Sequence, residues 1–151
     1  MKVTLDTNVL IYAYDNRDPA KRECAIEIAR VVGAHAGRCM ALQVIGEFYT
    51  VATRRLKMSG ADAATQCAAL HTHFPTFGYD QEHVTIALQA AAEGHFSYWD
   101  GLLLASAVSA DCNIFVSEDL QDRFRYNDLE VMSPFAAEGT PNPVLMDRLA
   151  N

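Results

Sequence analysis

The chain of 151 residues has little of what marks a membrane-bound, secreted or disulfide-rich protein. No apolar run approaches the ~20 residues that a membrane-spanning helix needs. The N-terminal segment turns acidic at Asp6, which is too early for a signal peptide. The cysteines are widely spaced and form no Cys-x-x-Cys pair, a pattern that favours free core thiols over disulfides or zinc ligands. We therefore expect a cytoplasmic protein without a membrane segment.

Positive charge is also scarce, because 12 Lys and Arg stand against 19 Asp and Glu and the net charge is −7. This balance argues against broad, non-specific binding of nucleic acid. It does not exclude a nucleic-acid enzyme that uses metal, since bound divalent cations offset carboxylates locally. Half of the residues are hydrophobic and 21% are charged, which excludes a disordered chain and suits a single folded domain.

Short apolar runs alternate with helical patterns, and no internal repeat or interdomain linker is present. We expect strands at residues 2–5, 39–42, 113–116 and 129–132 and a minor strand at 77–79. We expect helical segments at residues 7–14, 19–35, 43–57, 61–74, 81–93 and 97–110. This alternation predicts an α/β fold, with β-α-β units and a parallel sheet covered by helices on both faces. We place one domain at residues 1–135 and a peripheral C-terminal tail at 136–151.

Carboxylates without a local cationic partner are the most informative feature of the chain. They are Asp6, Glu47, Asp100 and Asp119. Asp6 and Asp119 each follow a predicted strand, and the carboxyl ends of neighbouring parallel strands meet at one edge of a sheet. Glu47 has no Lys or Arg three or four positions away, so no salt bridge within its helix is available. Hard oxygen donors of this kind suit magnesium or manganese better than zinc or copper.

Each carboxylate also has a simpler interpretation. Asp6 could only cap the helix that follows it, and Glu47 could be a solvated surface residue. The spacing from Ser97 to Asp100 fits a capping box. Asp119 stands beside Glu118, where acidic residues suit a helix start, and two adjacent acids cannot both easily face one site. Each motif alone is weak, but together they favour a divalent-metal site.

Several segments resemble the PIN-domain ribonucleases, and their order and spacing match the VapC-type toxins of bacterial toxin–antitoxin pairs. The segments are Val3-Thr4-Leu5-Asp6-Thr7-Asn8-Val9-Leu10-Ile11-Tyr12, Val44-Ile45-Gly46-Glu47-Phe48, Tyr98-Trp99-Asp100-Gly101-Leu102-Leu103-Leu104-Ala105 and Val116-Ser117-Glu118-Asp119-Leu120-Gln121. The resemblance covers residues 3–135. Two details depart from the family pattern: Ala41 stands where many relatives have serine, and Ser133 replaces a frequent asparagine.

The resemblance implies a three-layer α/β/α sandwich with a central parallel sheet. It also implies a metal-dependent endoribonuclease that uses Mg²⁺ or Mn²⁺ and is inhibited by a cognate antitoxin protein lying over the acidic cleft. The implied catalytic and metal-binding residues are Asp6, Glu47, Asp100 and Asp119, supported by Asn8 and Ser117.

Three alternative functions stay open at this point. One is a non-catalytic PIN-fold module that binds RNA or protein, and another is a housekeeping RNA-processing nuclease without an antitoxin. The last is a phosphohydrolase with an aspartyl nucleophile. That chemistry is disfavoured because Asn8 stands where a second acid is expected.

Two groups of basic residues follow proposed site elements and are candidates for contacts with RNA phosphates. They are Arg17, Lys21 and Arg22, and Arg54, Arg55 and Lys57. Any one of them alone could simply be solvated helix surface. The Ala-rich helices at 61–74 and 81–93 offer more apolar surface than a small domain needs, so we expect a homodimer. The alternative is a monomer whose helices complete the core.

Overall fold

A computed structural model describes residues 1–150, and a four-stranded sheet lies at its centre. The strands follow the order β1 (Val3–Leu5), β4 (Ile114–Val116), β6 (Leu129–Met132) and β5 (Arg125–Tyr126). The first three are parallel and completely buried, and their residues are apolar except for Thr4 and Glu130. Leu5 pairs with Val116, so β1 and β4 end side by side. The residues that follow these two strands therefore emerge at the same edge.

A second pair of parallel strands extends this layer. β2 (Met40–Ala41) pairs with β3 (Thr76–Phe77), and a parallel bridge from Val3 to Arg38 joins β2 to β1. The predicted central parallel sheet is confirmed, except at the edge formed by β5. That strand runs antiparallel to β6 in a tight hairpin, where Asn127 takes a positive φ of 54°. The sequence analysis did not predict this strand.

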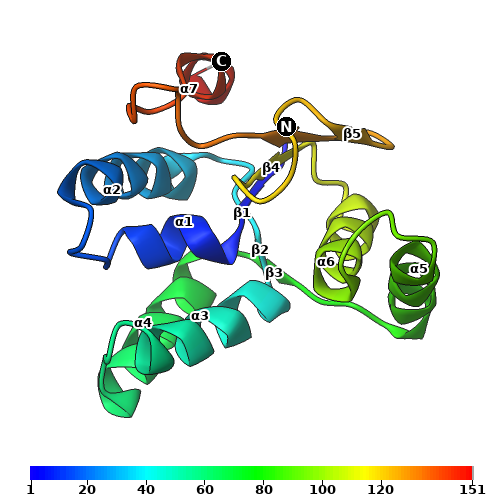
Figure 1. Ribbon diagram of the computed structural model, residues 1–151, viewed down its shortest axis with the longest axis horizontal. Coiled ribbons are helices and arrows are strands. Elements are labelled where there is room, and N and C mark those ends of the chain that lie inside the picture. Colours follow the sequence, from blue (N-terminus) through cyan, green and yellow to red (C-terminus); the bar gives the residue numbers. More distant parts are fainter. Residues whose placement is uncertain (151) are drawn as a thin grey trace.

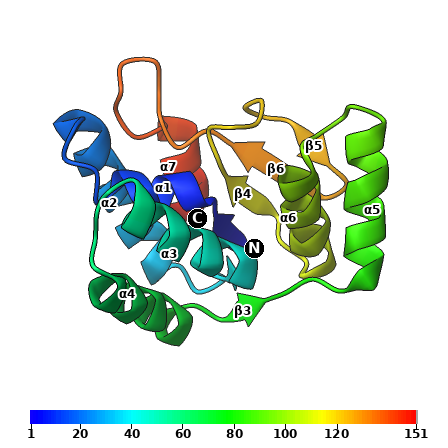
Figure 2. The ribbon, with the colours of Figure 1, turned by 60° about the horizontal axis from the view of Figure 1, so that its bottom comes forward.

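Helices cover both faces of the sheet. They are α1 (Thr7–Tyr12), α2 (Pro19–Ala34), α3 (Leu42–Arg54), α4 (Gly60–His73), α5 (Gln81–Ala92), α6 (Tyr98–Ser109) and α7 (Pro143–Ala150). The first six were predicted to within a few residues. Figures 1 and 2 show α1, α2 and α7 on one side of the strands and α5 with α6 on the other, while α3 packs on α1 and α4. Within residues 1–150, no helix is long and apolar enough to cross a membrane.

The C-terminal segment differs from the peripheral tail that the sequence suggested. Residues 143–150 form α7, and this helix packs against α2. Leu145 is fully buried and Leu149 is 7% exposed, so both belong to the core. The Arg148 guanidinium also reaches the buried Glu130 carboxylate of β6, 3.6 Å away. The glycine and prolines before α7 suggested an irregular tail, although Leu145 and Leu149 have helical spacing. A domain boundary at residue 135 stays a prediction.

Candidate active site

All four predicted carboxylates line one groove of about 540 Å³. Asp6 follows β1, Glu47 lies on α3, Asp100 lies in the first turn of α6, and Asp119 follows β4. The remaining lining residues are Thr7, Asn8, Gln43, Gly46, Thr50, Val51, Tyr79 and Trp99. The structure thus brings together segments that are far apart in the sequence at the carboxyl ends of neighbouring strands. The catalytic and metal-binding roles of these residues stay predictions.

Asp6 is the most deeply buried of the four carboxylates and is 7% exposed. One oxygen accepts a hydrogen bond from the Thr7 amide at 2.7 Å, which caps α1, and the other accepts from the Ser117 hydroxyl at 2.7 Å. Burial raises the pKa of Asp6 from 3.8 to about 6, and the negative charges of Asp119 and Glu47 add to this rise. The two hydrogen bonds oppose it. Asp6 is therefore a helix cap that also lines the groove, so its two interpretations coexist.

Glu47 is half-buried and held by two neutral donors. The Thr7 hydroxyl donates to its Oε2 at 2.8 Å, and the Gln43 side-chain amide donates to its Oε1 at 2.8 Å. Sequence reasoning missed both partners. Gln43 precedes Glu47 by one helical turn, which is a readable signal, whereas the contact with Thr7 depends on how α1 packs on α3.

Asp119 and Asp100 complete the acidic lining. The Asn8 side-chain amide donates to the Asp119 carboxylate, and the Asp119 amide donates to the Ser117 hydroxyl at 3.2 Å. Burial raises the pKa of Asp119, and the charges of Asp100 and Glu118 raise it further. The Ser97 hydroxyl accepts from the Asp100 amide at 3.1 Å, but in the described chain the Asp100 carboxylate makes no return bond. The capping box suggested by the sequence is therefore only half formed.

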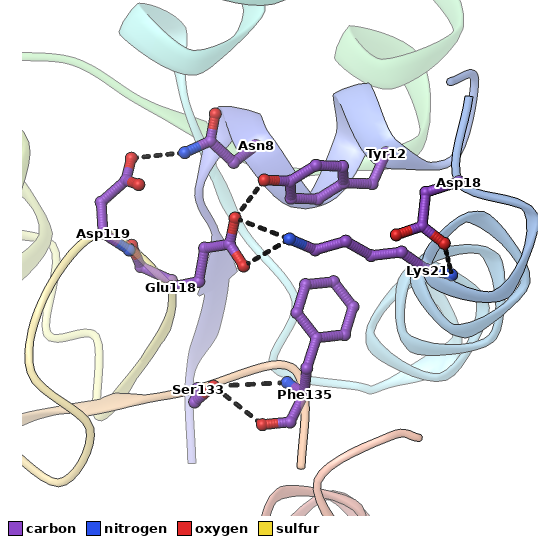
Figure 3. A network of polar contacts seen from close by, with 9 residues as sticks. Asn8, Tyr12, Asp18, Lys21, Glu118, Asp119, Ser133 and Phe135 are labelled. Atoms are coloured by element: carbon purple, nitrogen blue, oxygen red, sulfur yellow. Dashed lines mark hydrogen bonds and ion pairs between the residues drawn. The ribbon is translucent and has the colours of Figure 1, made fainter. Parts of the chain in front are cut away.

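Glu118 and Asp119 are adjacent yet point to different partners on α1 (Figure 3). Asp119 meets Asn8, whereas Glu118 accepts from the Tyr12 hydroxyl one helical turn further on. Glu118 also pairs with the Lys21 ammonium at 2.9 Å, and this cation lies 4.0 Å from the centre of the Tyr12 ring. Lys21 was predicted to contact RNA, but here it is engaged in holding the segment that carries Asp119.

The other predicted basic residues lie outside the groove. Arg17 pairs with Asp15 at 2.5 Å, and these contacts, with a smaller effect from Arg55, lower the pKa of Asp15 to about 2. Of the predicted basic candidates, four are exposed and make no ion pair within residues 1–150: Arg22, Arg54, Arg55 and Lys57. None of the six basic candidates is among the residues that line the acidic groove of the described chain. Their proposed contacts with RNA stay predictions.

The donor set fits a hard divalent cation. None of the four carboxylates takes part in an ion pair in the described part of the chain, and Asp6 holds its proton more tightly than usual. In the same residues, no set of three or more His, Cys, Asp or Glu is already arranged to hold a metal ion. The carboxylate oxygens of the groove are nevertheless the kind of donor that hard divalent cations prefer.

The fold and the groove together define a class of α/β domain. In this class, carboxylates without a cationic partner gather at the carboxyl ends of neighbouring parallel strands. The family model of the PIN domain matches residues 3–127, and the chain belongs to this family. No curated protein was found that matches the chain.

Solved structures share the fold at low sequence identity. VapC20 of Mycobacterium tuberculosis, described as a sarcin–ricin loop cleaving toxin, has a TM-score of 0.60 at 17% identity, covering 76% of this chain and 87% of that chain. DNA-bound VapBC of Salmonella typhimurium gives 0.59 at 17% identity, with 88% and 98% covered. VapBC2 of Rickettsia felis, bound to a promoter DNA fragment, gives 0.62 at 11% identity, with 88% and 98% covered. These likenesses show the fold alone.

Proposed function

We propose that this chain is a metal-dependent endoribonuclease that acts as the toxin of a VapBC-type toxin–antitoxin pair in the cytoplasm. The observation that carries the proposal is the convergence of four carboxylates without cationic partners in one groove of a PIN domain. The resemblance of the fold to VapC20 and to VapBC complexes supports the same function.

Asp6, Glu47, Asp100 and Asp119 would hold Mg²⁺ or Mn²⁺. When bound, such a cation lowers the pKa of a water molecule and stabilises negative charge on the phosphate during displacement. Three neutral donors orient the carboxylates: Ser117 fixes Asp6, Asn8 fixes Asp119, and Thr7 fixes Glu47. These donors leave each carboxylate with its negative charge, which a cation requires.

Asp6 would have to be ionised to hold a cation. Because burial and neighbouring charges raise the pKa of Asp6 to about 6, the proton competes with the metal in mildly acidic solution. The Ser117 hydroxyl donates to Asp6 and favours its ionised form. We therefore expect the apparent metal affinity to fall as the pH drops below about 6.

Two apolar surfaces outside the acidic groove are candidates for binding a protein partner. A second, apolar groove of about 630 Å³ lies between α1, α2, α3 and α4, and exposed Tyr14 and Ile26 line it. On α5, Ile86 and Leu88 are 37% and 57% exposed. These surfaces support the predicted homodimer and the binding of an antitoxin, whose arginine side chains would pair with the acidic lining.

The experiment is an RNA cleavage assay with the purified chain. We expect cleavage with Mg²⁺ or Mn²⁺, none with a chelator, and none from Asp6→Asn, whose fold should stay intact. Asp62→Asn, an exposed residue of α4, is the matched control and should cleave like the wild type. Full cleavage by Asp6→Asn would contradict the proposed site.

Light scattering of the chain, alone and with the product of the neighbouring reading frame, separates the alternatives. If the chain is a dimer that binds this product and then no longer cleaves RNA, the result supports a toxin of a toxin–antitoxin pair. A monomer in both conditions with undiminished cleavage supports a housekeeping RNA-processing nuclease. Binding of RNA without cleavage under any metal condition supports a non-catalytic RNA-binding module.

A further inference from the structure

Two exposed aromatic side chains line the acidic groove. Trp99 is 56% exposed and Tyr79 is 49% exposed, the largest exposed fractions that the described chain gives for aromatic side chains among its exposed large hydrophobics, and both belong to the same lining as the four carboxylates. They come from different parts of the chain, because Tyr79 follows β3 and Trp99 opens α6. Large apolar rings that stay in contact with water beside a polar site mark a surface for binding a ligand.

Trp99 is connected to the acidic site through its backbone. The Trp99 carbonyl accepts a hydrogen bond from the Gln43 side-chain amide at 3.1 Å, and the same amide nitrogen donates to Glu47. The Trp99 ring also meets Tyr98 edge-on, with 4.9 Å between ring centres. The backbone at Trp99 is therefore linked through Gln43 to a carboxylate of the groove, which places the attachment point of the ring beside the acidic site.

Charge cannot supply the affinity of this groove for a nucleic acid. In the described chain, its lining contains four carboxylates and no Lys, Arg or His. A phosphate backbone is repelled there wherever no cation intervenes, so the part of the substrate that lies in this groove must be bound by a different kind of contact. Stacking of bases on aromatic rings is such a contact, because it needs no positive charge and every base has a face to offer.

We propose that Trp99 and Tyr79 form a stacking platform for unpaired bases of the RNA, next to the phosphate that lies at the carboxylates. The inference rests on the proposed function and deepens it by assigning two side chains of this chain, Trp99 and Tyr79, to the binding of the bases. Paired bases are stacked on one another inside a helix and cannot lie on a protein ring without being splayed out. The platform thus selects unpaired segments, whatever their sequence.

The single tryptophan of the chain makes the binding test direct, because the fluorescence of Trp99 reports only on this site. The probe is a single-stranded RNA of about 12 nucleotides, a length within the range of single-strand sites. It is titrated into Asp6→Asn protein with Mg²⁺, so that cleavage does not intervene. Two matched probes are an abasic strand with the same phosphates and a blunt duplex of the same sequence. We expect the single strand to quench Trp99 and the abasic strand and duplex to leave it nearly unchanged.

Variants then measure the contribution of each ring. Trp99→Ala and Tyr79→Ala should each weaken single-strand binding, followed with a labelled RNA, by roughly 5- to 100-fold. Trp99→Phe should recover much of the loss, because it keeps an aromatic face. Tyr49→Ala removes a ring of similar exposure, 41%, from α3 outside the groove and should bind RNA like the parent. In the cleaving background, Trp99→Ala should raise KM far more than it lowers kcat.

Equal quenching by the single and abasic strands, or unchanged affinity after removal of both rings, would overturn the platform. A change of Trp99 fluorescence with protein concentration alone would also overturn it, since the ring would then lie between two copies of the chain. Failure of the proposed function has a different signature: no RNA is cleaved by the wild type under any metal condition. Base-dependent quenching in that case would still support the platform.

Discussion

Replacing Asp6 by asparagine should stabilise the metal-free protein above pH 6 while abolishing cleavage. The folded chain raises the pKa of Asp6 from 3.8 to about 6. Each pKa unit corresponds to about 1.4 kcal/mol, so keeping Asp6 ionised costs the fold about 3 kcal/mol. Asparagine retains an oxygen for the Thr7 amide and a polar group for Ser117, which are the two contacts of the carboxylate. After allowance for weaker hydrogen bonds, we expect a gain of about 1–3 kcal/mol.

The sign of the pH dependence follows from linkage. Below about pH 4, Asp6 is protonated in both the folded and unfolded chains, so its ionisation does not lower the unfolding free energy of the wild type. As the pH rises from there, the unfolded chain ionises first, so the wild type loses stability until the folded Asp6 has also ionised, just above pH 6. The difference in unfolding free energy between Asp6→Asn and the wild type should therefore open between about pH 4 and pH 6 and stay constant above.

The assays are urea denaturation and thermal denaturation of both proteins with a chelator at a series of pH values, together with Asp62→Asn as an exposed control. At about pH 8 the melting temperature of Asp6→Asn should exceed that of the wild type by about 5 °C. Saturating Mg²⁺ should narrow or reverse the difference, because a ligand at about 100 times its Kd adds about 2.7 kcal/mol to the protein that binds it. A difference that stays flat with pH, or a variant less stable throughout, would refute the reasoning.

Three further predictions address the core, one close approach of the backbone and the RNA surface. Leu145→Ala should lower the unfolding free energy by about 2–5 kcal/mol in urea denaturation, whereas Val144→Ala, at an exposed neighbouring position, should change it by less than about 0.5 kcal/mol. Gly37→Ala should destabilise by about 1–3 kcal/mol in the same assay, because its Cβ would lie 1.9 Å from the carbonyl oxygen of the first residue. Reversing the charges of Arg54 and Arg55 should weaken RNA binding and reduce the salt slope by about 1.4, and an unchanged slope would remove them from the interface.

The sequence predicted the parts of the fold that local patterns determine. The start of α2 agrees with the predicted helix at residues 19–35, and Asp18 caps it with its side chain accepting from the Lys21 amide, while Ser97 caps α6. The edge shared by Asp6 and Asp119 followed from two strands and a rule about parallel sheets, and the pairing of β1 with β4 bears this out. β5 was missed because two residues carry no periodicity, although Asn127 before Asp128 is a hairpin signal.

The contacts between elements could not be derived in the same way. Nothing in the local sequence relates Thr7 to Glu47, or Glu118 to Lys21 and Tyr12, since each pair joins separate segments that only the packing of helices brings together. From their adjacent positions in the sequence, Glu118 and Asp119 were not expected to face one site together. In the structure the two carboxylates accept hydrogen bonds from different residues of α1 that lie one helical turn apart. Asn8 donates to Asp119, and Tyr12 donates to Glu118.

The sheet ends on both sides in strands of only two residues. β3 forms one edge with Thr76–Phe77, and β5 forms the other with Arg125–Tyr126. An incoming extended segment would find almost no ladder of free amides and carbonyls to continue, and Arg125 places a charge on one of these edges. Short edges of this kind protect a protein from edge-to-edge aggregation and disfavour partners that bind by adding a strand. Any protein that associates with this chain is therefore expected to dock on its helices.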